Sequence, residues 1–103
     1  MPNSLSTPRL ATASQIKITN LTLTNANIEY THTLQNNLQT ITVIARTFCL
    51  LKFSFTVGEL DVEYLTVPEG CSRTIEGVKF NGKTIYIQSP TAGVVVEIEE
   101  LYS

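Results

Sequence analysis

Short runs in which apolar and polar residues alternate, repeated along most of the chain, are the feature that most constrains its fold. Such runs occur at 28–34, 41–45, 51–57 and 94–98. A period of two places alternate side chains on opposite faces of a β-strand, and an apolar set marks the face that packs on a core. No segment shows the 3.6-residue period of an amphipathic helix. The pattern therefore predicts a protein built from strands.

Turn residues separate these runs. Asparagine, glycine and proline gather where a chain reverses, and they do so at 24–27, 35–37, 68–70, 81–82 and 89–93. Seven or eight strands bounded by such turns predict an all-β, antiparallel two-sheet sandwich, jelly-roll-like in architecture. The strand order stays open at this level.

Two local features give sharper expectations. Asn81-Gly82 is the dipeptide typical of a two-residue hairpin turn, so the flanking runs are expected to pair, with Ile85 and Ile87 opposite Val78 and Phe80. The apolar parity changes between Ile16/Ile18 and Leu21/Leu23. Because one extra residue moves every later side chain to the other face, this change predicts a bulge or bend near Asn20.

A chain of 103 residues has room for one domain. Residues 1–14 are polar and contain Pro2 and Pro8, which predicts a flexible or extended arm; residues 15–103 are expected to form the sandwich. No apolar run has the length of a signal peptide or a membrane span. We therefore expect a soluble protein made in a cytoplasm.

The charge balance excludes two partner classes. Seven basic residues are spread singly among nine acidic ones, for a net charge of −2. Nucleic-acid and anionic-membrane binding both need clustered basic residues, so neither is expected. Charged residues make up only 16% of the chain, below the usual ~25%, which favours a surface hidden against a protein partner. Cys49 and Cys71 are expected to be free thiols, with a single disulfide as the alternative.

The catalytic candidates all have structural interpretations. Glu97 and Glu99 occupy the polar face of the last run, and Glu100 has inward parity at an end that is expected to fray. His32, the only histidine, alternates with Tyr30 and Leu34 and is interpreted as a structural or interface residue. The chain lacks phosphate-loop, dinucleotide, zinc-protease and serine-hydrolase motifs. We expect no enzymatic activity and no cofactor.

One acidic loop is a weak metal candidate. Glu59, Asp61 and Glu63 alternate in the stretch GELDVEY, and hard cations such as Ca²⁺ take several oxygen ligands. The spacing does not match an EF-hand loop, so a solvated loop is the favoured interpretation.

The run from Phe48 to Val57 predicts an interface. Cys49, Leu51, Phe53, Phe55 and Val57 form its inward face, whereas Phe48 and Leu50 are apolar on the outward face. A two-layer sandwich covers only the inner face of each sheet. Together with Tyr86, which has outward parity in its own run, Phe48 and Leu50 are therefore expected to contact another subunit or partner.

Three stretches, KITNLTLTNANIEYTHTL, YLTVPEG and GKTIYIQSPTAGVVVEIEEL, resemble small strand-rich virion proteins of tailed bacteriophages, of the head-decoration (cement) or fibre type. The resemblance covers residues 15–103 and lies in turns and threonine-rich strands, so it transfers no site residue. It implies a structural virion protein, a capsid-decoration module made in the host bacterial cytoplasm. Its implied partners are copies of itself, with a trimer favoured, and the major capsid protein or other virion proteins. A carbohydrate- or metal-binding β-sandwich of a host-recognition component is the alternative.

Overall fold

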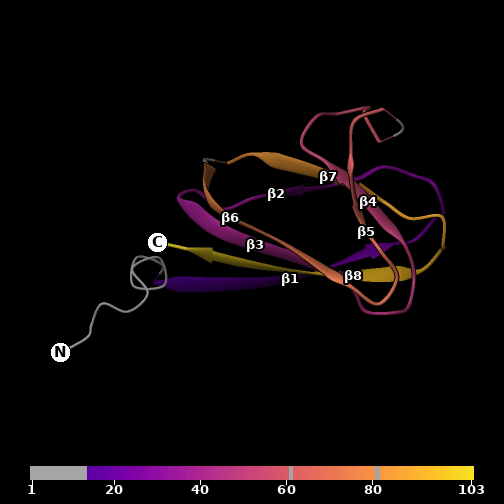
Figure 1. Cartoon of the computed structure of the whole chain (residues 1–103), viewed down its shortest axis with the longest axis horizontal. Coiled ribbons are helices and arrows are strands. Elements are labelled where there is room, and N and C mark those ends of the chain that lie inside the picture. Colours follow the sequence, from indigo (N-terminus) through magenta and orange to yellow (C-terminus); the bar gives the residue numbers. More distant parts are fainter. Residues whose placement is uncertain (1–13, 61, 81) are drawn as a thin grey trace.

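The computed structural model describes residues 14–103 apart from residues 61 and 81, without the side chains of 77–80. Its eight strands form two layers (Figure 1). In chain order they are β1 (Gln15–Leu23), β2 (Tyr30–Thr33), β3 (Leu38–Ala45), β4 (Leu51–Ser54), β5 (Leu65–Val67), β6 (Ser72–Phe80), β7 (Thr84–Gln88) and β8 (Val94–Tyr102).

The strand order defines a jelly roll. One sheet has the order β1-β8-β3-β6 and the other β2-β7-β4-β5. All the pairings are antiparallel, and they join β1 to β8, β2 to β7, β3 to β6, and β4 to β5. The first strand thus pairs with the last, the second with the seventh, and so on inward. This pattern results when one long antiparallel hairpin of eight strands folds over into two sheets. The predicted all-β sandwich is confirmed.

The turns form where the sequence places its small polar residues. Asn27 and Asn37 both have a φ of 56°, in the left-handed region that asparagine tolerates better than most residues. Gly93 has a φ of 75° and donates its N–H to the carbonyl of Leu23 at 2.8 Å. These residues end β1, β2 and β7 and send the chain across to the other sheet.

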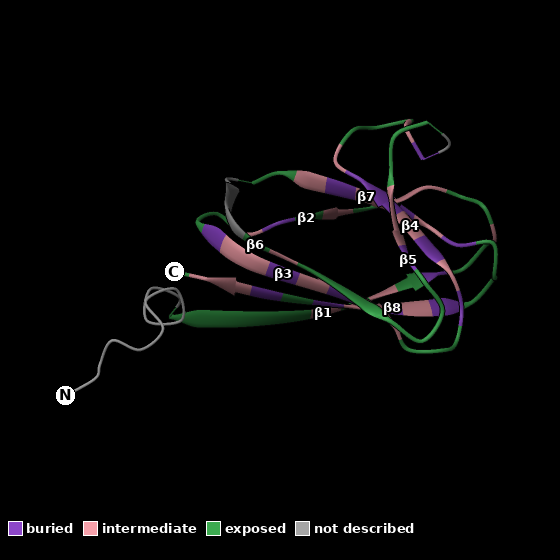
Figure 2. Cartoon of the chain, in the orientation of Figure 1, coloured by how far each residue is buried: buried purple, intermediate pink, exposed green. Residues whose placement is uncertain are grey.

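The core lies between the sheets and follows the predicted alternation. On β8, Val94, Val96 and Ile98 are all buried, as predicted (Figure 2). Together with them, the buried apolar cluster holds Leu23, Leu34, Leu38, Ile41, Val43, Cys49, Leu51, Phe53, Val67, Ile85 and Ile87. Both cysteines are free, as expected, Cys49 in the core and Cys71 at the surface.

The hairpin predicted at Asn81-Gly82 is wrong. Gly82 does have a positive φ of 66°, and Asn81 lies outside the described residues. However, β6 pairs with β3 in one sheet, whereas β7 pairs with β2 and β4 in the other. Local turn chemistry therefore does not decide which strand becomes the neighbour.

The bulge predicted near Asn20 is also wrong. β1 pairs with β8 without a register shift from Gln15 to Leu23. Ile16 and Ile18 are simply on the outward face, where they are 65% and 67% exposed. The parity change in the sequence therefore marks a switch from apolar residues on the outer face to apolar residues on the inner face. The irregularity that the structure does contain lies in β3, between Leu38 and Thr40.

β4 is shorter than the run at 51–57 predicted. Cys49, Leu51 and Phe53 are buried as expected, but β4 ends at Ser54, and Val57 is 64% exposed. Ser54 accepts a hydrogen bond from the N–H of Thr56 at 3.1 Å, which turns the chain out of the sheet. Val62 lies in a turn, and its N–H donates a hydrogen bond to the carbonyl of Glu59.

Candidate interaction surface

The outer face of the β1-β8-β3-β6 sheet carries an unusual number of aliphatic side chains. Strand register sets Ile16 opposite Leu101, Thr22 opposite Val95, and Ile44 opposite Glu97. We call the aliphatic residues of this surface the aliphatic face: Ile16, Ile18, Ile44, Val95 and Leu101. Ile16 and Ile18 are largely exposed, and the other three are half-buried.

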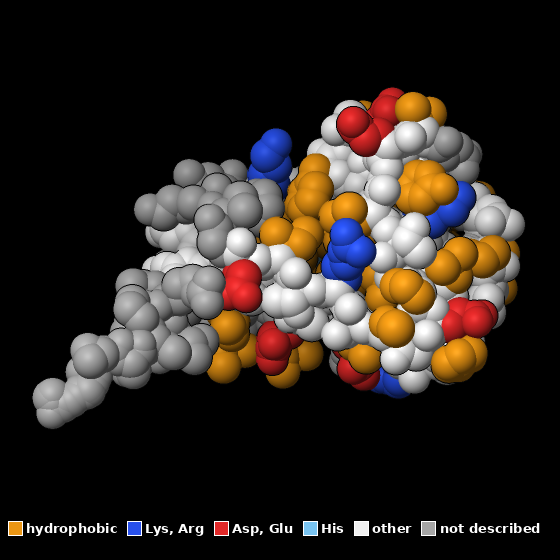
Figure 3. Space-filling view, viewed as in Figure 1, with side chains coloured by type: hydrophobic (Ala, Val, Ile, Leu, Met, Phe, Trp, Pro, Cys, Tyr) orange, Lys and Arg blue, Asp and Glu red, His pale blue; other side chains and the backbone are white. Residues whose placement is uncertain are grey.

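A shallow hollow of about 210 Å³ lies in the aliphatic face, lined by Ile18, Thr42, Ile44, Glu97, Ile98 and Glu99. Hydrophobic side chains along the lower margin of the molecule lie next to acidic ones (Figure 3). Thr42 and Thr74 hydrogen-bond across β3 and β6 through their hydroxyls at 3.0 Å. The surface is therefore apolar at β1, carries carboxylates at β8 and presents hydroxyl groups toward β6.

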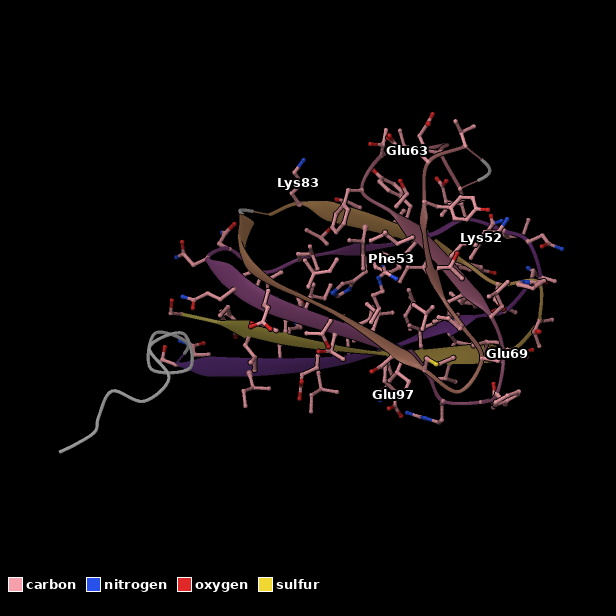
Figure 4. All side chains as sticks on the ribbon, in the orientation of Figure 1. Lys52, Phe53, Glu63, Glu69, Lys83 and Glu97 are labelled. Carbon is pink, nitrogen blue, oxygen red and sulfur yellow. The ribbon has the colours of Figure 1, made fainter. Side chains whose placement is uncertain are left out.

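The glutamates of β8 divide between the two faces. Glu97 projects away from the sandwich (Figure 4) and accepts a hydrogen bond from Arg46 Nε at 2.8 Å. Glu99 is exposed on the same outer face. Both positions agree with the polar parity predicted for them. Because β8 lies between β1 and β3, the two carboxylates lie in the middle of this face, between Ile18 of β1 and Ile44 of β3.

Glu100 departs from the expectation of a fraying end, because it is fully buried. Its Oε1 lies 3.0 Å from His32 Nε2, and its Oε2 accepts the backbone N–H of Gln35 at 2.9 Å. β8 belongs to one sheet and β2 to the other, so this pair links the two layers through the interior. A buried carboxylate is tolerated when it is paired and hydrogen-bonded, and His32 is thereby given a structural position.

The interface residues expected from the sequence do not form one patch. Phe48 is 75% exposed and lies against Gly70, where an added Cβ would be 2.8 Å from its Cε1 atom. Leu50 and Tyr86 are half-buried. Tyr86 lies opposite Ser54 at one end of the outer face of β4 and β7, whereas Leu50 precedes the other end of β4. Leu50 and Ser54 are four positions apart, which is about 13 Å along an extended strand.

The acidic loop has no metal-ligand cluster in its described part. Residues 14–60, 62–80 and 82–103 contain no group of three His, Cys, Asp or Glu side chains placed to hold an ion. Asp61 lies outside the described residues. The carbonyl of Glu59 accepts hydrogen bonds from the N–H groups of Val62 and Glu63 at 3.0 and 2.9 Å, which hold these two residues close to Glu59.

A second hollow, of about 230 Å³, lies beside the β4–β5 loop. We call it the aromatic hollow, and its lining residues are Phe53, Ser54, Phe55, Thr56, Glu63, Tyr64 and Leu65. The rings of Phe53 and Phe55 meet edge to face with centroids 6.0 Å apart, and Lys52 Nζ lies 4.7 Å from the centre of the Tyr64 ring. In Figure 4 Phe53 lies between the sheets and Glu63 on the loop.

The sequence pattern did contain a signal for the aliphatic face. The opposed parities of Ile16/Ile18 and Leu21/Leu23 mean that one pair must face outward if the strand is regular. The prediction of a bulge instead assigned both pairs to the inner face, which left the aliphatic face unpredicted. The His32–Glu100 contact had no comparable signal, since the two residues are 68 positions apart.

The topology and the core define an eight-stranded jelly-roll β-sandwich. Comparison of the chain with known protein families, with curated proteins and with solved structures finds no match. Residues 14–60, 62–80 and 82–103 include no helix long and apolar enough to span a membrane.

Proposed function

We propose that the protein is a structural component of a tailed-phage virion, a capsid-decoration module that acts by protein–protein contact, made in the bacterial cytoplasm and without catalytic activity or a cofactor. The aliphatic face carries this proposal. Jelly rolls are used by both capsid and lectin domains, so the fold alone does not choose a function. The resemblance of residues 15–103 to small virion proteins supports the choice of a capsid.

The chemistry of the aliphatic face suits a protein partner. Exposed aliphatic side chains gathered on one face of a sheet are typical of an interaction site. Burying a large aliphatic side chain is worth roughly 1.5–3 kcal/mol, so covering Ile16, Ile18 and Ile44 would stabilise a complex appreciably. Glu97 and Glu99, on the strand between Ile18 and Ile44, then favour a partner surface that presents basic groups among apolar ones.

Two experiments test the proposal. Mass spectrometry of purified particles from the source should find the chain in a fixed ratio to the major capsid protein. Purified protein should also bind particles that lack it, and Ile44→Asp should reduce this binding at least tenfold. Val57→Asp, in an exposed loop outside the aliphatic face, should bind like the unaltered protein. Absence from particles, or equal binding by both variants, would refute the virion function.

The aromatic hollow favours a second candidate, a carbohydrate-binding module of a host-recognition component. Tyr64 is 41% exposed at this hollow, and aromatic rings beside a carboxylate such as Glu63 suit the apolar faces and hydroxyl groups of a sugar. Tyr64→Ala should then abolish binding on a glycan array, while Tyr86→Ala, an aromatic truncation outside this hollow, should not. If no glycan on the array binds, capsid decoration is the better supported of the two functions.

A further inference from the structure

We propose that β1 is a pairing edge, through which two copies of this chain join their β1-β8-β3-β6 sheets into one continuous antiparallel sheet. The inference concerns the isolated protein and does not depend on the virion function. It rests on the backbone of an edge strand rather than on the aliphatic face alone.

The four sheet edges are protected to different degrees. An edge strand presents unpaired N–H and C=O groups, and proteins usually blunt it by shortness or charge. β2 and β5 have only four and three residues. β6 has nine but its sequence includes Arg73, Glu76 and Lys79. β1 has nine residues, one charge at Lys17, and no proline.

β1 is also regular and open. Its pairing with β8 runs over all nine residues without a shift, so the opposite edge is straight enough to receive another strand. Residues 15–18 are exposed whether they face inward or outward, which means that the second sheet does not cover this half of β1. In Figure 1 β1 runs along the lower margin of the sandwich with no described strand beyond it, and Figure 2 colours its first half exposed.

A second copy is the partner that fits this edge. Two β1 strands related by a two-fold axis perpendicular to the sheet are antiparallel, and all nine residues overlap only if the axis passes through Thr19. This register sets Lys17 opposite Leu21 of the partner, whereas an axis at Lys17 would set two lysines against each other. Ile18 of each copy becomes a diagonal neighbour of the other, within reach for aliphatic side chains.

Thr19 adds an independent observation. Among the described residues, its Oγ1 is a buried side-chain oxygen with no hydrogen-bond partner. Buried polar groups are nearly always satisfied in native proteins. At the two-fold axis Thr19 would lie opposite its own copy, and facing threonines on paired strands hydrogen-bond to each other. After a rotation about χ1, pairing would give this hydroxyl the partner that it lacks in the isolated chain.

Sedimentation of the full chain tests the pairing. The unaltered protein should sediment as a dimer of the 11.4 kDa chain as its concentration rises. Ile18→Lys places two lysines beside the axis and should weaken dimerisation at least tenfold without unfolding the monomer. Val62→Lys, the same kind of change at a loop residue that is 77% exposed, should dimerise normally. A monomer at every concentration would overturn the proposal.

Disulfide trapping tests the register. In a Cys71→Ser background, which removes the exposed thiol, Thr19→Cys should form a covalent dimer on mild oxidation, because directly opposed strand residues lie within disulfide range. Thr22→Cys is six residues from its own copy in this register, about 20 Å, and should not cross-link. If the Ile18→Lys variant still dimerises and Thr19→Cys does not cross-link, the dimer uses another face. This result would refute the assignment of β1.

Discussion

At the residue scale, Glu100 and His32 form the least expected contact of the molecule. A carboxylate that is removed from water needs partners, and Glu100 has two, the imidazole of His32 and the N–H of Gln35. Breaking such a pair from one side leaves a buried group uncompensated, whereas replacing both sides with apolar groups removes the need for pairing. Removing either residue alone is therefore expected to destabilise the protein more than replacing both residues with apolar ones.

His32→Leu should lower the free energy of unfolding by roughly 1–3 kcal/mol, because Glu100 stays buried but loses one of its two hydrogen-bond partners. The double variant His32→Leu with Glu100→Leu should be more stable than His32→Leu alone. Urea unfolding followed by circular dichroism measures both. Glu99→Gln, a change at the exposed neighbour, should stay within about 0.5 kcal/mol of the unaltered protein. A double variant less stable than the single one would contradict this account.

Gly70 and Phe48 make a second residue-scale prediction. Gly70 and Gly58 share a φ of 76°, but only Gly70 has a neighbour, the Phe48 ring, where a Cβ would be added. Gly58→Ala should cost about 1–2 kcal/mol for the left-handed conformation. Gly70→Ala should cost more, since the ring must move, and the excess should disappear in a Phe48→Ala background. Thermal unfolding of the four variants measures this coupling, and an equal cost in both backgrounds would show that the ring contact is negligible.

At the scale of elements, β8 is the strand on which the whole arrangement depends. It pairs with β1 on one side and with β3 on the other. Its even-numbered residues from Val94 to Glu100 fill the core, and its odd-numbered residues from Val95 to Leu101 lie on the outer face. One strand therefore supplies both the packing of the sandwich and part of the aliphatic face.

Neighbouring valines of β8 should respond in opposite ways to the same change. Val96→Asp would place a charge in the core and should prevent folding, since an unpaired buried carboxylate costs several kcal/mol. Val95→Asp, on the half-buried outer face, should leave a folded protein. Two-dimensional NMR spectra of the two variants distinguish the cases. Dispersed spectra for both would mean that the assigned faces of β8 are wrong.

At the scale of the whole molecule, the jelly roll joins distant parts of the chain. β1 cannot complete its pairing until β8 is present, because residues 15 to 23 pair with residues 94 to 102. Folds dominated by such non-local pairing fold slowly, since loop-closure entropy must be overcome before the contacts form. The topology thus bears on how the chain folds as well as on its final shape.

Refolding of the full chain from urea should take milliseconds to seconds, the range of two-sheet β-proteins. Stopped-flow fluorescence of the tyrosines measures it. A version that ends at residue 93, without β8, should not fold, because β1 and β3 then lose their shared neighbour. Refolding in microseconds, or a stable truncated protein, would contradict the observed strand order.

The sequence by itself determined the fold class, the turns and most of the core. Alternation places Val94, Val96 and Ile98 on one face whatever the strand order, and the asparagines at 27 and 37 reverse the chain because left-handed backbone is accessible to them. These are local properties, since each depends on a residue and its near neighbours along the chain.

Only the tertiary structure decided which strands are neighbours and what lies at the surface. Asn81-Gly82 has the composition of a hairpin turn, yet β6 and β7 on either side of it belong to different sheets. Glu100 has the parity of a core residue, but His32 and Gln35, which make its burial tolerable, come from the other end of the chain. Ile16 and Ile18 are apolar residues on an outer face. Strand pairing and burial are set by contacts between distant segments, which a local pattern does not specify.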